Sequence, residues 1–268
     1  MLRTRIITAV VLIAVLLAVL FVLPASLGVA AVAAAVLLGA WEWTAFVGLR
    51  SGVQRGAYLA LVALVSVVAW LALMVERDLT PLLWLSLGWW LLALLWVLRF
   101  PRPISAQLVA LCGIAVLVPL GLVLAALLAT PGPDGAQLLM LMLVIVWSAD
   151  IGAFFAGRAL GRVKLAPRVS PGKTWEGVIG GVCAAAAAAA AGAWSLDLPL
   201  SGFVFLGIAV AGISVVGDLT VSMFKRNAGL KDSGHLIPGH GGILDRIDSL
   251  ASAAPLYLLG LAWLGVAP

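Results

Sequence analysis

Nine long apolar runs occupy most of this 268-residue chain and restrict the folds open to it. A helix that rises about 1.5 Å per residue needs roughly 20 apolar residues to cross about 30 Å of hydrocarbon, and the runs have about that length. With 64% hydrophobic and only 10% charged residues, the composition is not that of a soluble domain. We therefore predict an all-α fold, a polytopic membrane bundle of about nine transmembrane helices. The runs cover residues 6–23, 27–47, 56–75, 81–98, 104–129, 136–157, 177–195, 202–224 and 249–266.

The basic residues between these runs orient the predicted bundle, because Lys and Arg accumulate in cytoplasmic loops. If all nine runs span the membrane, 15 of the 16 Lys and Arg residues fall on one side and only Arg77 falls on the other. We predict that this side is cytoplasmic and that the N-terminus lies on it. The net charge of +5 then reflects membrane topology, and nucleic acid is not an expected partner.

Two aspartates lie within predicted spans, Asp150 and Asp218. A carboxylate in lipid costs at least about 2.5 to 3.5 kcal/mol on insertion scales, so each needs compensation. One interpretation is a simple pair with a basic residue near the interface, such as Arg158, which follows Asp150 on the same helical face. The other is a functional site.

The functional interpretation is stronger for Asp218. Ser222 follows it by one helical turn, and Lys225 and Arg226 follow by two. One helical face would then present a carboxylate, a hydroxyl and two cations, a combination that suits a metal-bound phosphate.

A polar stretch from Asn227 to His240 follows this span and leads through Gly241 and Gly242 to the final span. Asp245 and Asp248 are three residues apart at the start of that span, so they share a helical face. A helix N-terminus also offers free N–H groups to an anion. Helix capping and interfacial anchoring explain one Asp and one Arg here, but not three carboxylates and four cations around one junction.

The segment from Ser222 to Asp248 contains SMFKR at 222–226, KD at 231–232 and LIPGHGGILDRID at 236–248. This pattern resembles the signature of the phosphatidate cytidylyltransferases, also called CDP-diacylglycerol synthases. SPGKTWEG at 170–177 resembles a second element of the family, with a glycine where lysine is more usual. Asp150, with the Gly-Arg pairs at 157–158 and 161–162, also resembles the family. Together these elements cover roughly the last 120 residues.

The resemblance implies a nucleotidyltransferase of phospholipid biosynthesis in the plasma membrane, the inner membrane of a bacterium, with its active site facing the cytoplasm. Its substrates would be CTP and phosphatidate, and its products CDP-diacylglycerol and pyrophosphate. The implied cofactor is Mg²⁺, with K⁺ as a candidate second cation. Residues 1–135 would form an N-terminal transmembrane region of about five spans, and residues 136–268 the catalytic region with its cytoplasmic loops.

The same resemblance suggests roles for individual residues. Metal binding would fall to Asp218 and Asp245, with Asp248 as a further ligand, because hard oxygen ligands suit magnesium. His240 would orient a phosphate or assist the departure of pyrophosphate, or would only hydrogen-bond within its loop. The other expected catalytic residues are cations that hold phosphates, Lys225, Arg226, Lys231 and Arg246. The expected substrate-binding residues are Asp150, Ser170, Lys173, Thr174, Glu176, Ser222, Gly241 and Gly242.

Two other site types are excluded. Gly172-Lys173-Thr174 has the form of a P-loop ending, but Pro167 stands where the required glycine should be, and we predict no strand before it. His235 and His240 lack the nearby cysteines of a structural zinc site.

The eight-alanine tract 184–191 and the three glycines before it indicate close packing of helices, which is compatible with a homodimer. Two other functions stay open: a CTP-dependent lipid-alcohol (polyprenol) kinase, and an ion-coupled transporter with Asp150 and Asp218 as membrane carboxylates.

Overall fold

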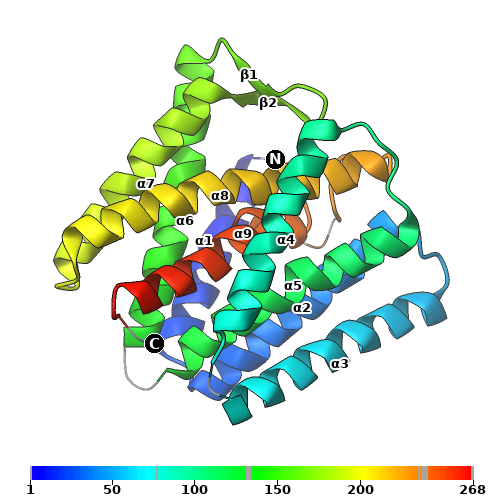
Figure 1. Cartoon of the computed structure of the whole chain (residues 1–268), viewed down its shortest axis with the longest axis horizontal. Coiled ribbons are helices and arrows are strands. Elements are labelled where there is room, and N and C mark those ends of the chain that lie inside the picture. Colours follow the sequence, from blue (N-terminus) through cyan, green and yellow to red (C-terminus); the bar gives the residue numbers. More distant parts are fainter. Residues whose placement is uncertain (1, 77, 131–133, 235, 237–240, 267–268) are drawn as a thin grey trace. The chain divides into compact units, whose positions relative to one another are not determined.

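The computed structural model describes residues 2–76, 78–130, 134–234, 236 and 241–266. Within these residues the chain forms nine helices and one pair of short strands (Figure 1), and each predicted apolar run coincides with a helix whose ends lie within five residues of it. The predicted helices are therefore confirmed. In chain order the elements are α1 (Leu2–Phe21), α2 (Ala25–Val47), α3 (Gly52–Glu76), α4 (Thr80–Arg99), α5 (Ala106–Ala129), α6 (Asp134–Leu160), β1 (Lys164–Ala166), β2 (Ser170–Thr174), α7 (Trp175–Ser195), α8 (Leu200–Asn227) and α9 (Leu244–Trp263).

Seven of the described helices, α2 to α8, are long and apolar enough to cross a bilayer. The apolar part of α1, Ile6–Phe21, is shorter, and α9 carries Asp245, Arg246 and Asp248 in its first two turns. The chain is thus a nearly all-α integral membrane bundle. Arg77, the one basic residue predicted on the opposite side, lies outside the described residues.

The chain divides into two compact units, each built from separate stretches of sequence. The first consists of Met1–Leu79, Pro103–Gln137 and Phe224–Ile247, and in it α2 packs against α3 and α5. Trp43 of α2 is fully buried and donates a 2.8 Å hydrogen bond to the carbonyl of Val109. Gly113 of α5 makes room for this indole, because a Cβ on Gly113 would lie 2.6 Å from the Trp43 Nε1 atom.

The second unit consists of Thr80–Arg102, Leu138–Met223 and Asp248–Pro268. Its helices α6 and α7 approach backbone to backbone, since a Cβ on Gly152 would lie 2.7 Å from the carbonyl oxygen of Gly180. Further along α7, one face of the alanine tract is fully buried, and a Cβ on Gly207 of α8 would lie 2.6 Å from the Ala189 side chain. The predicted packing role of these small residues is confirmed within this unit.

A short antiparallel hairpin joins α6 to α7, with Lys164 of β1 opposite Thr174 of β2 (Figure 1). The expectation that no strand precedes the Gly172-Lys173-Thr174 segment is therefore wrong, because the segment lies in β2 and follows β1. Strands of three and five residues, of which the second contains Pro171 and Gly172, show no apolar alternation, which explains why the sequence did not predict them. The exclusion of a P-loop now depends on Pro167 alone.

Candidate functional site

The second unit contains a cavity of about 510 Å³ that brings several predicted site residues together. Its walls come from α6, β2, α7 and α8. Asp150 and Arg158 of α6, Lys173 of β2 and Asp218 of α8 supply its charged lining. Small residues of α6 and α7 also line the cavity, among them Ala149, Ala153, Gly177 and Gly181.

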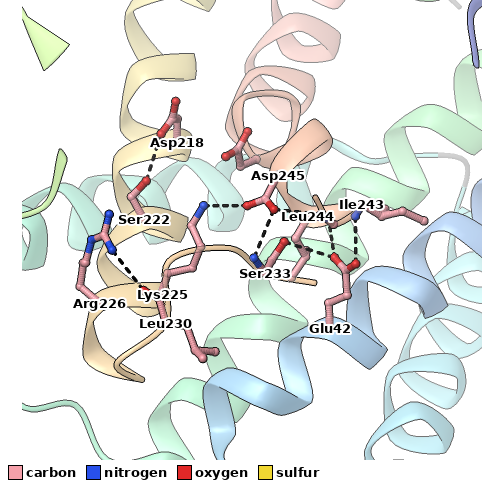
Figure 2. Close-up of polar contacts among 12 residues, drawn as sticks. Glu42, Asp218, Ser222, Lys225, Arg226, Leu230, Ser233, Ile243, Leu244 and Asp245 are labelled. Carbon is pink, nitrogen blue, oxygen red and sulfur yellow. Dashed lines mark hydrogen bonds and ion pairs between the residues drawn. The ribbon is translucent and has the colours of Figure 1, made fainter. Parts of the chain in front are cut away.

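Lys173 and Asp218 form an ion pair on the wall of this cavity. The Lys173 Nζ atom lies 2.7 Å from Asp218 Oδ2, and the two side chains are 27% and 28% exposed. Ser222, one turn further along α8, donates a 3.2 Å hydrogen bond to Asp218 Oδ1 (Figure 2). Both carboxylate oxygens thus have partners, and one of those partners is a partly exposed ammonium group.

The local structure of the hairpin explains how Lys173 is presented. Thr174 caps α7, because its hydroxyl oxygen accepts a 3.1 Å hydrogen bond from the Gly177 N–H. The Glu176 carboxylate accepts hydrogen bonds of 3.1 and 3.2 Å from the Val163 N–H, one residue before β1. The two contacts hold the base of the hairpin against α7 and leave Lys173 on the cavity side.

The predicted substrate-binding residues of this region therefore separate into two groups. Asp150, Ser170, Lys173 and Thr174 all line the cavity that Asp218 lines. Glu176 does not line it, and its carboxylate faces the base of the hairpin instead.

The first unit contains a second polar cluster, around Asp245 at the start of α9 (Figure 2). Lys225 Nζ lies 2.7 Å from Asp245 Oδ1, and both side chains are only 12% exposed. The N–H groups of Gly242 and Ser233 donate to Asp245 Oδ2 at 3.0 and 3.2 Å. Burial opposes ionisation of this carboxyl group, but the Lys225 ammonium and the Gly242 N–H outweigh it and hold its pKa below the ordinary value. Asp245 is thus an ionised group enclosed by donors of its own unit.

Glu42 of α2 belongs to the same cluster, and the sequence reasoning missed it. Its side chain is buried, with 4% exposed, and its oxygens accept hydrogen bonds from the N–H groups of Ile243 and Leu244 at 3.0 and 2.8 Å. The Ser233 hydroxyl donates a third, at 3.3 Å (Figure 2). A signal was present, because Glu42 lies in the predicted span 27–47, where a carboxylate needs compensation just as Asp150 and Asp218 do.

Gly241 and Gly242, both predicted to bind substrate, have conformational and steric roles in this cluster. Gly241 has a φ of +84°, a left-handed conformation that favours glycine. A Cβ on Gly242 would lie 2.5 and 2.6 Å from the Glu42 carboxylate oxygens. Their binding of substrate stays a prediction.

The other predicted phosphate-binding cations of this region are exposed. The Arg226 guanidinium donates a 3.2 Å hydrogen bond to the Leu230 carbonyl at the end of α8 (Figure 2). Lys231 and Arg246 are also exposed. His240 lies outside the described residues, as does His235.

Asp248 lies in the second unit, where α9 crosses α8 closely. The crossing point is Gly217, which immediately precedes Asp218. A Cβ on Gly217 would meet the backbone carbonyl oxygen of Asp248. The Ser252 hydroxyl donates a 2.7 Å hydrogen bond to the Ile213 carbonyl and fixes the crossing.

Among the described residues, no three His, Cys, Asp or Glu side chains gather in an arrangement that could hold a metal ion. The predicted magnesium site therefore stays a prediction.

Comparison with known proteins assigns the chain to a family. A sequence profile of the cytidylyltransferase family matches residues 3–264. The chain is 41% identical to the phosphatidate cytidylyltransferase of Haemophilus influenzae, over 96% of this chain and 97% of that protein. It is 43% identical to the phosphatidate cytidylyltransferase of Pseudomonas aeruginosa, over 98% and 97% respectively. The phosphatidate cytidylyltransferase of Brucella suis is 49% identical over 48% of each chain. The chain therefore belongs to the cytidylyltransferase family.

Proposed function

We propose that this enzyme transfers cytidylate from CTP to phosphatidate, giving CDP-diacylglycerol and pyrophosphate. The cavity of the second unit supports this proposal best, because it places cationic and carboxylate side chains together among three membrane-spanning helices. A lipid phosphate and a nucleotide both need cations, and a lipid substrate needs a site that it can reach from the bilayer. Two relatives that match over nearly their whole length carry the name of this activity.

The reaction requires two polyanions to meet in line. A phosphate oxygen of phosphatidate attacks the α-phosphorus of CTP, a new P–O bond forms, and the bond to the leaving pyrophosphate breaks. The lipid phosphate is already anionic near neutral pH, so the step needs no strong base. What it needs is neutralisation of charge and correct positioning, which Lys173 and Arg158 supply from the cavity wall.

The carboxylates of the cavity fit a divalent cation. Asp218 is a hard oxygen donor, partly exposed, with a lysine side chain as its charged partner, and Asp150 lines the same cavity. When bound, Mg²⁺ would neutralise phosphate charge and orient the reacting groups. Asp248 belongs to the same unit as Asp218 and is the further ligand that we propose there. Asp245 would have to exchange Lys225 to act as a ligand, because its oxygens are bonded to that lysine and to two N–H groups.

We also propose that the remaining cations of the family-like segment bind phosphates, and that Ser222 supports Asp218. The cations are Lys225, Arg226, Lys231 and Arg246, and each is tested by its effect on the KM for CTP. We further propose K⁺ as a second cation, which a titration of the activity with KCl tests. We also propose a homodimer, which the mass of the detergent-solubilised protein tests.

The proposed location is a bacterial inner membrane, with the N-terminus and the active site facing the cytoplasm. The distribution of 15 of the 16 basic residues on one side of a nine-span topology supports it. Reporter domains fused after α2 and after α3 test it, because these two positions should report opposite sides of the membrane.

Two labels on CTP distinguish the proposed reaction from its alternatives. Purified protein in phosphatidate micelles with MgCl₂ should transfer the label of [α-³²P]CTP to lipid and release the label of [γ-³²P]CTP as pyrophosphate. A lipid-alcohol kinase would instead transfer the γ label to a lipid alcohol. Ion flux in proteoliposomes with no turnover of CTP would indicate a transporter. The absence of α label from the lipid would contradict our proposal.

A further inference from the structure

Two carboxylates of the first unit connect the two ends of the segment between α8 and α9. We call these ends the neck: Ser233 lies on one side of it and residues 242–244 lie on the other. Asp245 binds the N–H groups of Ser233 and Gly242, which lie at the two sides of the neck. Glu42 also binds both sides, through the Ser233 hydroxyl and the N–H groups of Ile243 and Leu244. Figure 2 shows both carboxylates directed at this neck. Asp245 is part of the loop's own end, but Glu42 comes from α2, about 200 positions earlier in the chain.

The Glu42 contact replaces an ordinary helix cap. The first N–H groups of a helix have no partner within it, and a Ser, Thr, Asp or Asn side chain just before the helix usually supplies one. The residue before α9 is Ile243, which has no acceptor in its side chain. Glu42 supplies the acceptor instead, and a carboxylate at this position is favourable because of the helix dipole.

A local cap would satisfy the same N–H groups without placing a carboxylate in a predicted span, where it costs several kcal/mol. The long-range contact adds something that a local cap lacks, because it attaches the loop neck to α2. Glycines on both sides of the neck, Gly234 and Gly242, also lie against this carboxylate. A Cβ on Gly234 would meet Glu42 Oε1, and a Cβ on Gly242 would lie 2.6 Å from the same atom.

We infer that Glu42 is a positioning residue for the nucleotide: it holds Ser233 and residues 242–244 in the conformation in which the flanking cations bind the triphosphate of CTP. This inference rests on the proposed function, which assigns the flanking cations Lys225, Lys231 and Arg246 to phosphate binding. Glu42 itself touches no substrate and acts through the loop. Without it, Ser233 and residues 242–244 adopt the binding conformation for only a fraction of the time, and the apparent affinity for CTP falls by that fraction.

This role predicts a particular kinetic effect. Loss of the Glu42 contacts with the neck should raise the KM for CTP. The kcat at saturating CTP and the KM for phosphatidate should stay nearly unchanged. A purely structural role would act differently, because partial unfolding lowers the amount of active enzyme and therefore kcat, and leaves both KM values in place.

The test uses the full-length protein and the variants Glu42→Gln and Glu42→Asp. Glutamine has the same shape, but its NH₂ group cannot accept a hydrogen bond from Ile243 or Leu244. We expect Glu42→Gln to raise the KM for CTP at least about tenfold, which is roughly 1.4 kcal/mol. Glu42→Asp keeps the charge on a shorter side chain and should raise it less. Thr44→Ala is the matched control, because Thr44 is also buried in α2 but donates its hydrogen bond to the Trp41 carbonyl of the same helix.

Hydrogen exchange measures whether Glu42 holds the neck, independently of catalysis. In Glu42→Gln, amides of peptides that cover residues 241–247 should exchange faster, and peptides of α5 should not change. Unchanged exchange at 241–247 would overturn the inference that Glu42 holds the neck, even if the protein had no activity with CTP and phosphatidate. An inactive wild-type protein with the expected exchange would instead count against the proposed function alone.

Three further results would overturn the inference. One is an unchanged KM for CTP in an active Glu42→Gln protein. Another is a lower kcat and a lower unfolding temperature with both KM values unchanged. The last is failure of both variants to fold while Thr44→Ala folds, because Glu42 would then be needed for the structure as a whole.

Discussion

Asp218→Asn should separate catalysis from stability, because the Asp218 carboxylate pairs with Lys173 and is only partly buried. Its ion pair with Lys173 joins side chains that are 27% and 28% exposed, and such pairs contribute about 0 to 1 kcal/mol. The amide oxygen of asparagine can still accept the Ser222 hydrogen bond. We therefore expect a loss of at most about 1 kcal/mol in the free energy of unfolding. Removal of one group that stabilises the charge of a transition state, such as an oxyanion-hole donor, typically lowers kcat by a factor of about 10² to 10³, or roughly 2.7 to 4 kcal/mol, and we expect a loss of this order for Asp218→Asn.

The assay combines transfer of [α-³²P]CTP label to phosphatidate with thermal unfolding followed by tryptophan fluorescence. Asp197→Asn is the matched control, because Asp197 is exposed in the α7–α8 connection and its φ of 52° suits asparagine. This control should leave both activity and unfolding temperature unchanged. A loss of less than tenfold in kcat/KM for Asp218→Asn, or a loss matched by a large fall in unfolding temperature, would refute the reasoning.

A double variant with Lys173→Met identifies what the Asp218 carboxylate does. If Asp218 serves only to hold Lys173, the double variant should be no worse than Lys173→Met alone. If each side chain acts separately on the phosphates or on a metal ion, the two losses in kcat/KM should multiply. We expect the second result.

Two other changes test the cluster of the first unit. Gly242→Ala places a Cβ against the Glu42 carboxylate and should lower the free energy of unfolding by about 1 to 3 kcal/mol in chemical denaturation. Gly212→Ala, inside α8 at a position open around its Cβ, should not lower it. Asp245→Asn leaves Lys225 largely buried without its ionic partner and should destabilise the protein by about 3 to 5 kcal/mol at neutral pH. Because the pKa of Asp245 is lowered by folding, its contribution is present above the ordinary carboxyl value of about 3.9 and is lost as the pH falls through the lower folded value. The difference in unfolding temperature between wild type and Asp245→Asn should therefore be constant from pH 8 to about pH 5 and shrink below about pH 4; a difference that vanishes near neutral pH would contradict this assignment.

The helices were predictable from the sequence because each must supply about 20 apolar residues to cross lipid, and this requirement leaves a continuous signal. The one-turn spacing of Asp218 and Ser222 likewise predicted their contact, since residues four apart on a helix are neighbours. The approach of Lys173 to Asp218 was not predictable, because it depends on the path of a hairpin between α6 and α7. That hairpin is held by the Thr174 cap and the Glu176 contact rather than by an apolar pattern.

The partners of Asp245 and Glu42 were hidden for a different reason. A sequence shows that a carboxylate in a membrane helix needs compensation, but it does not show which donor will provide it. Glu42 is compensated by backbone N–H groups, and every residue except proline carries one, so no residue type marks the partner. Asp245 was expected to meet a metal ion, and in the structure it meets Lys225 and two N–H groups.

The distance in sequence between Glu42 and its donors also bears on how the protein is made. A chain is synthesised from its N-terminus, so α2 enters the membrane long before Ser233 and Leu244 leave the ribosome. During that interval the Glu42 carboxylate has none of these three hydrogen bonds and needs water or other donors instead. The packing of the first unit around α2 is therefore completed among the last steps of assembly, after the start of α9 has emerged.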